Sequence, residues 1–417
     1  MKDITQVAPP SEAILQPNTK AFARDPHSVY AQLRALETPY LLADFDGYVF
    51  SRFDDVRALA LCPDMVRGAQ AFMSEEDLAS EQRTKGWHDM PAHERFVQTN
   101  LLESDGADHR RLRATVFKAF TRQYVERHRE MVQAYADQMV EAALEKGEID
   151  FVADIALHMP GHIIGTILGV PAQDCPQLRI WSDDVVQFFG LERTEDDKKR
   201  AERATSEFHL YLIELIKARR RTPKNDLLSI LIAAQDAGDL SETELIATAM
   251  LILMAGHGST IDVMGSGCHA LLRHPDQMRS LRDNAELMPN AVQEMFRFDT
   301  PLPFFHRYAA HDCKVAGYHI PQGTKVGLLY AAANRDPSVY KSPDTFEIAR
   351  APNHHLAFGM GAHLCLGNNL SRLDMEILFN TLLVRTKAIA LRSDEVHYKT
   401  GISVRGPIAL PVTLTPV

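Results

Sequence analysis

The sequence predicts a mainly α-helical protein with a minor β part. Between residues 108 and 221, apolar residues recur at three- and four-residue spacing, which is typical of amphipathic helices. The longest periodic stretch begins at a capping box formed by Ser241 and Glu244 and ends before Pro275. Its length of about 32 residues corresponds to a helix of roughly 48 Å, enough to cross a whole domain. We therefore expect one long central helix.

The elements before residue 108 are mixed. Residues 39–53 predict a hairpin that turns at Asp46-Gly47, followed by a helix with Asp54 as its cap. Residues 68–104 combine mixed polarity with several turn signals, so we expect a long irregular segment, and such segments are often functional. No repeat or low-complexity linker marks a boundary. We expect a single domain over residues 1–417, with residues 1–25 as a loosely ordered N-terminal extension.

The chain after the long helix alternates short helices, strands and coil. Pro275 and Pro289 each stand where a helix would begin. Two short strands are predicted around the turn Pro321-Gln322-Gly323. Residues 334–363 are rich in Pro, Gly, Asn and Asp and should form an ordered coil. A last helix is expected directly after Cys365, with apolar positions 366, 370, 373 and 377 on one face.

Composition excludes several classes of protein. The formal net charge of -10 and the absence of a basic run argue against a nucleic-acid binder. The five cysteines are odd in number and form no CxxC pair, which favours a reducing, cytoplasmic setting. No segment offers the roughly 20 consecutive apolar residues that span a bilayer, and the N-terminus lacks a signal-peptide core. We expect a cytoplasmic protein that works without a membrane.

The strongest local signal is HLAFGMGAHLCLG, residues 355–367. Gly359 and Gly361 allow a tight loop, which delivers Cys365 to the start of a helix, where free N–H groups stabilise a thiolate. Such a cysteine can be a small buried residue, a nucleophile working with a histidine, or a metal ligand. A zinc site is a further alternative, although a second Cys pair at finger spacing is missing. Its ligands would be His354, His355, His363 and Cys365.

The stretch FGMGAHLCLG resembles the FGxGxHxCxG signature of the cytochrome P450 superfamily, soluble bacterial type. Three other stretches occur in the family's order: DGADHRRLR, AGHGST and EMFR, the last resembling its E-x-x-R motif. The resemblance runs from about residue 30 to the C-terminus. It implies a single-domain cytochrome P450 fold, with haem b between the long central helix and the helix that follows Cys365. It also implies a monooxygenase that uses O2.

The resemblance assigns roles to individual residues. Cys365 would be the axial thiolate of the haem iron, with Phe358 packed near its sulfur. Glu294 and Arg297 would be scaffold residues joined to Arg350 or Arg335. The remaining cofactor-binding residues are the loop glycine, one residue of the oxygen-binding helix and four partners of the haem propionates: Gly359, Ala255, His109, Arg113, Arg307 and His363.

The stretch AGHGST departs from the family. Gly258 stands where the family has an acid, and Ser259 stands where it has a threonine. We expect Gly256, Ser259 and Thr260 to share the face above the haem, where Gly256 leaves room for oxygen. Because a general acid contributes typically about 10²–10⁴-fold, its loss matters. We hypothesise that protons arrive through Ser259, Thr260 and water, or from a substrate group, and that His257 points toward a neighbouring helix.

The function implied is insertion of one oxygen atom from O2 into a small, largely apolar or aromatic substrate. Substrate contacts are expected from residues 68–100, 181–190, Leu253, 302–305 and 402–404, which include Phe188, Phe189, Phe304 and Phe305. Electrons would come from NAD(P)H through a reductase and a separate ferredoxin or flavodoxin, because no redox domain is fused. A basic face for that partner would comprise Arg110, Arg111, Lys118, Arg122 and Arg372.

We expect a monomer. Two alternatives stay open at this point. The first is an atypical member that uses peroxide, or that couples or rearranges a natural-product intermediate, which Gly258 suggests. The second is a non-catalytic haem-binding sensor or carrier.

Overall fold

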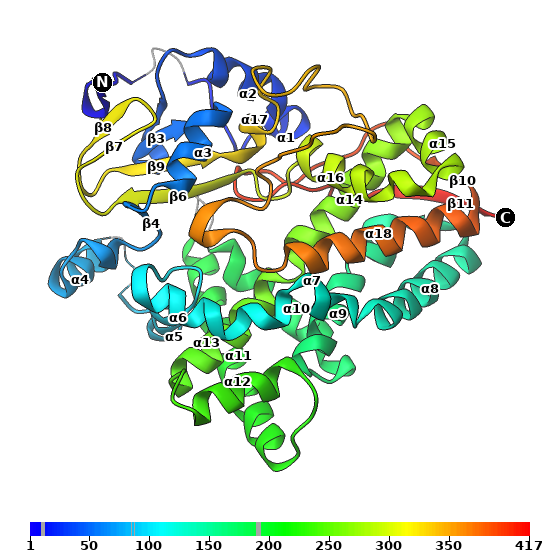
Figure 1. The fold of residues 1–417 in the computed structure, drawn as a ribbon, viewed down its shortest axis with the longest axis horizontal. Coiled ribbons are helices and arrows are strands. Elements are labelled where there is room, and N and C mark those ends of the chain that lie inside the picture. The colour runs from blue at the N-terminus through cyan, green and yellow to red at the C-terminus, as the bar shows by residue number, and fades with distance from the viewer. Residues whose placement is uncertain (10–12, 85, 87, 189–192) are drawn as a thin grey trace.

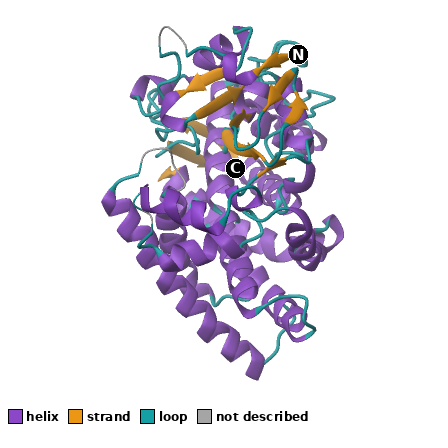
Figure 2. Ribbon diagram, turned by 90° about the vertical axis from the view of Figure 1, so that its left-hand side faces the viewer, coloured by secondary structure: helices purple, strands orange, loops and turns teal. Residues whose placement is uncertain are grey.

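The computed structural model describes residues 1–9, 13–84, 86, 88–188 and 193–417. As predicted, helices dominate (Figure 2). The strands of residues 2–66 and 304–329 lie on one side of the molecule, and those of residues 386–416 lie on the opposite side (Figure 1). The helices are α1 Lys20–Arg24, α2 Pro26–Ala35, α3 Phe53–Leu61, α4 Glu75–Thr84, α5 Pro91–Thr99, α6 Gly106–Phe117, α7 Arg122–Glu126, α8 Arg129–Lys146, α9 Met159–Leu168, α10 Cys175–Gln187, α11 Glu195–Arg221, α12 Leu227–Asp236, α13 Glu242–Ala255, α14 Gly258–Arg273, α15 Pro275–Asp283, α16 Met288–Phe298, α17 Tyr330–Ala333 and α18 Asn368–Arg385.

Three small sheets contain the strands. One has the order β2-β3-β9-β6-β4, one β1-β8-β7 and one β10-β11-β5. The strands are β1 Lys2–Asp3, β2 Tyr40–Leu42, β3 Gly47–Phe50, β4 Met65–Val66, β5 Glu148–Asp150, β6 Phe304–Ala309, β7 Cys313–Val315, β8 Tyr318–Ile320, β9 Lys325–Leu329, β10 Thr386–Leu391 and β11 Pro411–Pro416.

The central helix predicted as continuous is interrupted. α13 ends at Ala255 and α14 begins at Gly258, and His257 leaves the helical conformation with φ -125°. The His257 ring binds the carbonyl of Leu253 at 2.8 Å, the acceptor that a continuous helix would reserve for the backbone N–H of residue 257. The prediction failed because glycines on both sides of His257 lower the cost of leaving the helix. The capping box of Ser241 and Glu244 is confirmed.

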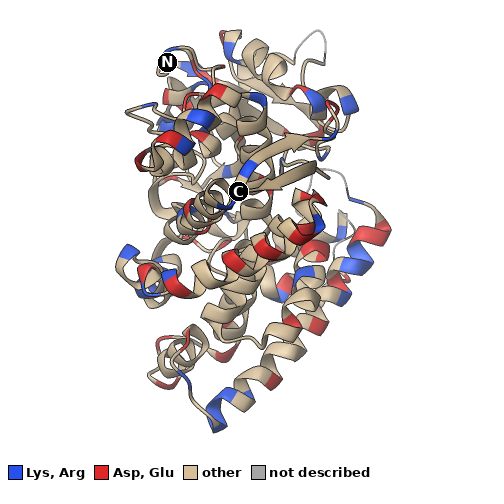
Figure 3. Cartoon of the chain, turned by 90° about the vertical axis from the view of Figure 1, so that its right-hand side faces the viewer, with Lys and Arg blue, Asp and Glu red and all other residues tan. Residues whose placement is uncertain are grey.

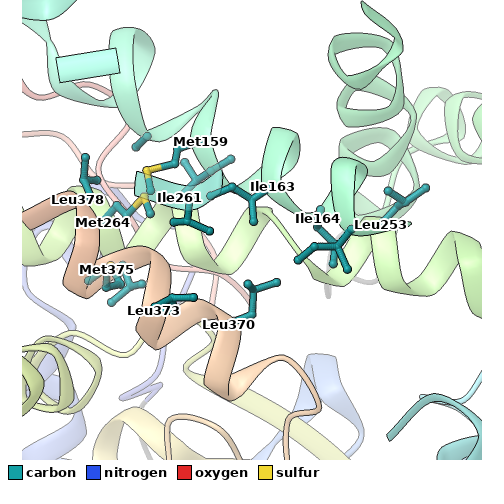
Figure 4. Packing of buried hydrophobic residues seen from close by; sticks show 14 of the residues in the cluster. Met159, Ile163, Ile164, Leu253, Ile261, Met264, Leu370, Leu373, Met375 and Leu378 are labelled. Carbon is teal, nitrogen blue, oxygen red and sulfur yellow. The ribbon is translucent and has the colours of Figure 1, made fainter. Parts of the chain in front are cut away.

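The segment from α13 to α14 lies in the centre of the helical part. By length and composition it could cross a membrane, but 72% of its most apolar window is buried inside the protein. Figure 4 shows Ile261 and Met264 of α14 packing between Met159 and Ile163 of α9 on one side and α18 on the other. Full burial of each such side chain is worth roughly 1.5–3 kcal/mol. This packing fixes α14 against α18, the helix that follows Cys365.

The sheets confirm some predicted strands and correct others. The hairpin of β2 and β3 turns at Asp46, whose φ is +52°. The following helix begins one residue before Asp54, which lies in its first turn instead of capping it. The strands on either side of Pro321 are present as β8 and β9, but they belong to different sheets and form no hairpin. The sheet to which a strand belongs depends on pairing partners that are distant in the sequence, so the local sequence pattern could predict the strands but not their sheets.

Two N-terminal predictions differ from the structure. The expected loose extension is ordered in its described part, since β1 pairs with β8 and Ile4 is fully buried. Residues 10–12 lie outside the described part. The segment 68–104, expected to be irregular, contains α4 and α5. Tertiary contacts hold α5, because Glu202 of α11 accepts hydrogen bonds from the backbone N–H groups of Ala92 and His93, both at 3.0 Å.

Candidate active site

Cys365 lies in the coil that leads into α18. Its N–H donates to the carbonyl of Phe358 at 2.8 Å, which closes the loop that carries it (Figure 1). Burial raises the pKa of the Cys365 thiol, while hydrogen bonds from the N–H groups of Gly367 and Asn368 and the positive charge of Arg113 oppose that shift. Cys365 thus lies close to the start of α18, where the sequence predicts it, and its thiolate state stays a prediction. A thiolate there is favoured further when a metal ion binds it.

The two loop glycines are required by the backbone. Gly359 and Gly361 have φ values of +66° and +74°, in the left-handed region that favours glycine. A Cβ on Gly361 would lie 2.6 Å from the carbonyl oxygen of Ala60 at the end of α3. The loop is therefore wedged against α3.

Phe358 is held between two partners. Its ring centroid lies 4.5 Å from that of Phe296 in α16, and the guanidinium carbon of Arg372 lies 4.5 Å from its centroid. The ring is thus fixed on the same loop as Cys365, where the sequence predicts it to pack near the sulfur. Its relation to the sulfur stays a prediction.

Glu294 anchors the coil before this loop. It accepts both hydrogen bonds from Arg297 at 2.7 Å, and Arg350 approaches both of its oxygens at 3.2 Å. Glu294 and Arg297 are fully buried. Of the two arginines expected here, Arg350 joins the pair, whereas Arg335 binds the carbonyl of Phe298. The scaffold interpretation of the E-x-x-R motif is thereby confirmed.

α6 brings His109 and Arg113 to the Cys loop. Arg113 donates to the carbonyl of Leu364 at 2.6 Å, and the His109 ring centroid lies 4.3 Å from that of His363. His109 is 3% exposed, and its Nε2 has no hydrogen-bond partner in the part of the chain that the structure describes. Burial, reinforced by the positive charges of His363 and Arg113, lowers the pKa of His109 to about 4.

Arg307 reaches the same region from β6. It is buried, donates to the carbonyl of His306 at 2.8 Å, and burial together with the charge of Arg67 lowers its pKa to about 10. Arg67 itself was missed by the sequence analysis. It is buried, pairs with Glu103 and has an Nε without a partner. Nothing in its surroundings, MVRGAQ, distinguishes it from a surface arginine.

Asp105 was also missed, although it precedes α6 directly. Its carboxylate accepts from the N–H groups of Arg67 and Gly68 at 2.8 and 3.2 Å and lies 3.1 Å from Nε2 of His363. It therefore orients His363. The position just before a predicted helix was the available signal.

The zinc alternative is not supported. His355 binds Gln293 and His363 binds Asp105, so neither turns toward Cys365. In the described ranges, no group of three or more His, Cys, Asp or Glu side chains is placed to hold a metal ion.

The junction of α13 and α14 presents an open face. Ala255 is exposed although Met254 and His257 on either side are buried. A Cβ on Gly258 would meet nothing within 4 Å. Ser259 is partly exposed, and its hydroxyl has no hydrogen-bond partner among the described residues. Ala255, Gly258 and Ser259 are therefore the residues that border open space here.

The structure does not bring Gly256 and Thr260 to that face with Ser259. A Cβ on Gly256 would lie 2.7 Å from Cγ1 of Ile164 in α9, so this glycine permits close helix packing. The Thr260 hydroxyl is buried and lies 3.1 Å from that of Ser371 in α18. The expectation failed because the break at His257 changes the register of residues on the two helices. His257 does point toward a neighbouring helix, with Nε2 at 3.8 Å from Asp183 of α10.

Comparisons with known proteins agree with these features. Residues 70–395 match the family model described as Cytochrome P450. The chain belongs to the cytochrome P450 family. It is 35% identical over 404 residues to the vitamin D(3) 25-hydroxylase of Pseudonocardia autotrophica, covering 95% of both chains.

Solved P450 structures share the fold. P450BioI in complex with hexadec-9Z-enoic acid ligated acyl carrier protein matches with a TM-score of 0.87 and 30% identity, over 94% of this chain and 100% of that one. The cytochrome P450 enzyme CxnD for C–S bond formation in chuangxinmycin biosynthesis matches with a TM-score of 0.86 and 32% identity, over 97% and 100%. The predicted single-domain P450 fold is confirmed. Members of this family are monooxygenases that use haem b, O2 and electrons from NAD(P)H through redox partners.

The residues around Cys365 fit a haem. The unpartnered nitrogens of His109 and Arg67 are buried donors in a region crowded with positive charge. Buried donors without acceptors are costly, so the site suits a ligand that brings anionic oxygens beside the thiolate. The two propionates of a haem have that chemistry.

Several expected substrate contacts of this P450 belong to its core instead. Leu253, Phe304 and Ile402 are almost fully buried in hydrophobic clusters. Phe188 is buried with Met90 and Ala201. Phe305 is only partly buried and keeps its candidacy. Phe189 lies outside the described residues.

Proposed function

We propose that this P450 inserts one oxygen atom from O2 into a small, largely apolar or aromatic substrate, with Cys365 as the axial ligand of the haem iron. The observation that carries the proposal is the loop of residues 358–365, which presents a cysteine whose sulfur faces backbone N–H groups beside a cationic cluster. Ala255 and Ser259, on the open face of the central segment, would border the space for oxygen and substrate.

The chain's own residues have distinct tasks in this mechanism. Bound haem supplies the redox chemistry with O2. Cys365 would hold the haem iron through its sulfur, and the N–H groups at the start of α18 would tune the strength of that sulfur as a donor. His109, His363, Arg113 and Arg307 would neutralise the propionates, with Arg67 as a further cation.

Ser259 is the hydroxyl that we propose to hold a proton or a water near the oxygen, because its Oγ is uncommitted. Thr260 is bound to Ser371 and would act mainly in joining α14 to α18. Gly258 provides no acid, so a proton must reach Ser259 from another group or from the substrate.

We propose a ferredoxin or flavodoxin with its reductase as the electron source. Arg110, Lys118 and Arg122 are exposed on or near α6, beside Phe117, which is 51% exposed. A positive face with an exposed aromatic suits an acidic redox protein. Figure 3 shows Lys and Arg interspersed with Asp and Glu along the helices that are viewed from the side of the C-terminus. The other two members expected in this face, Arg111 and Arg372, are engaged with Glu244 and Asn368.

The substrate class rests on the apolar and aromatic composition of the expected contact segments, in which Phe305 is only partly buried. The similar proteins act on, or are named for, chemically different molecules, so they do not narrow the choice. Cytoplasmic location and a monomeric state stay predictions.

The reduced-plus-CO difference spectrum tests the proposal. Wild type should give the red-shifted band of thiolate ligation, and Cys365→Ala should lose it while still folding. Absence of the band in folded wild type, or its persistence in the variant, contradicts the assignment. A panel of small apolar molecules, scored by their shift of the haem spectrum, then identifies substrates.

A second candidate is peroxide-driven oxidation, or coupling or rearrangement of a natural-product intermediate. Gly258 favours it, because peroxide brings its own protons and the missing acid then costs little. Turnover with peroxide alone, compared with a surrogate ferredoxin, reductase and NADPH, separates the two. Faster turnover with the redox partners excludes a purely peroxide-driven enzyme.

A further inference from the structure

The turn that begins α14 has no acid at Gly258, and a carboxylate of another helix, α10, lies near this turn. Gly258 opens onto space, with nothing within 4 Å of the position of its missing Cβ. Two residues flank it on the helix, His257 before it and Asp262 one turn later. Each of them faces a charged partner outside α14.

His257 joins this turn to α10. It is 3% exposed, and its Nδ1 lies 2.8 Å from the carbonyl oxygen of Leu253. A carbonyl only accepts, so Nδ1 carries the hydrogen. Nε2 then faces Oδ1 of Asp183 at 3.8 Å. The imidazole and the carboxylate of Asp183 are thus within range of an ion pair, at a separation longer than a direct hydrogen bond.

Asp183 also has access to solvent. Its side chain is 47% exposed and binds Arg179, one turn earlier on α10, at 2.9 Å. The next residue, Asp184, faces elsewhere, because its carboxylate lies 3.4 Å from Arg200 of α11. Only the first of these two neighbouring carboxylates is therefore directed to the α13–α14 junction.

Asp262 follows Gly258 by one helical turn and is the second buried polar residue of this part of α14. Asp262 is 3% exposed and binds Nζ of Lys399 at 2.6 Å. Side chains of a helix lean toward its N-terminus, so this carboxylate leans toward the turn that starts at Gly258. Burial raises the pKa of Asp262, and the negative charge of Asp183 adds to that shift. Asp183 is thus within electrostatic range of both flanking residues.

We propose that Asp183 supplies from α10 the carboxylate that α14 lacks at Gly258, and that it acts through His257 as a positioning residue for proton delivery. This inference rests on the proposed function. Asp183 takes a proton from solvent and shares it with Nε2 of His257 beside the opening at Gly258. Each proton that passes from this pair to water or substrate in the opening is replaced by one from solvent, so the charge of the pair is restored.

A charge-specific stability cycle on the haem-loaded protein tests the placement. Gly258→Asp and Gly258→Asn differ in charge and little in shape. With Asp183 present, Gly258→Asp should melt at a lower temperature than Gly258→Asn, because the two carboxylates repel each other. In an Asp183→Asn background at least half of this difference should vanish, whereas Asp184→Asn should leave it unchanged. An equal difference in all three backgrounds overturns the placement.

Oxygen consumption tests the proton delivery without a known substrate. With a surrogate ferredoxin, its reductase and NADPH, two electrons and two protons convert O2 to hydrogen peroxide, and four of each convert it to water. Asp183→Asn should raise the ratio of peroxide to water several-fold, and Asp183→Glu and Asp184→Asn should not. Gly258→Asp combined with Asp183→Asn should lower the ratio again.

The outcomes distinguish the role inferred for Asp183 from the proposed function of the protein. An unchanged ratio in Asp183→Asn, in protein that shows the red-shifted CO band and consumes O2, overturns this inference and leaves the proposed function standing. Loss of the band in wild type overturns the proposed function itself.

Discussion

Replacing Glu294 by Gln removes one negative charge from a site that holds two buried guanidinium groups. The carboxylate accepts from Arg297, Arg350, the backbone of Glu347 and the amide of Asn353. Gln has nearly the same shape but offers one acceptor oxygen, and its NH2 group points donors at donors. The variant therefore leaves the charges of Arg297 and Arg350 without a counter-charge at 0% and 7% exposure.

Removing one partner of a buried ion pair costs about 3–5 kcal/mol. A chain of 417 residues has an unfolding entropy of roughly 0.9 kcal/mol/K at about 2.1 cal/mol/K per residue. The expected fall in melting temperature is therefore about 3–6 °C. The pair Glu126 and Arg129 has the same residue types and spacing but is 48% and 46% exposed. Glu126→Gln should cost at most about 0.5 kcal/mol, which is less than 1 °C.

Differential scanning calorimetry of the haem-loaded variants measures both shifts. Haem retention during gel filtration gives a second readout, because Glu294 orders the coil that leads to the Cys365 loop. Equal melting temperatures for Glu294→Gln and wild type, or an equal fall for Glu126→Gln, would refute the reasoning that burial makes this pair different.

Three further predictions follow from the packing of α14 and from burial. Gly256→Ala should lower stability by about 1–3 kcal/mol because its Cβ meets α9 at 2.7 Å, whereas Gly258→Ala should be neutral or stabilising by up to about 1 kcal/mol; urea unfolding distinguishes them. Ser371→Ala should lower the free energy of unfolding by about 0.5–1.5 kcal/mol and leave the yield of product per electron unchanged. Ser259→Ala should leave stability unchanged and lower the yield of product per electron. An equal yield in Ser259→Ala and wild type contradicts the proposed role of the Ser259 hydroxyl. Burial lowers the pKa of His93 to about 4, so between pH 6.5 and 4 the unfolded chain binds a proton that the folded one does not. The free energy of unfolding therefore decreases as the pH is lowered through this window. His93→Asn should reduce the drop in the urea midpoint between pH 7 and pH 5.

Features encoded by a few adjacent residues could be predicted from the sequence. The loop around Cys365 is one, because its glycines, its histidine and the helix that follows lie within a dozen residues. The helix N-terminus at Ser241 is another. The roles expected of His109, Arg113 and Arg350 came from the family resemblance, which these short local motifs were sufficient to establish.

Features that depend on distant segments were not predicted. Asp105 orients His363 across 258 positions of sequence, and Arg67 enters the cationic region only through the pairing of β4 with β6. The helix breaks at His257 because the ring of this residue binds the carbonyl of Leu253 in the preceding turn. The apolar periodicity of the sequence predicted a continuous helix because it does not contain this side-chain bond. Gly256 appeared to serve oxygen, but the packing of α9 explains it.

The pairing of β1 with β8 constrains how the chain matures during synthesis. Lys2 pairs with Tyr318, so the segment around Lys2 finds its partner only after 316 more residues have been added. At about 5–20 residues per second, this delay is roughly 15–60 s. Throughout that time Ile4, fully buried in the finished molecule, is in water or in contact with a chaperone. The segment of β1 is thus secured late in synthesis, although it precedes β8 by more than 300 residues, and a slow or hindered pairing should lower the yield of folded protein more than the activity of the finished molecule.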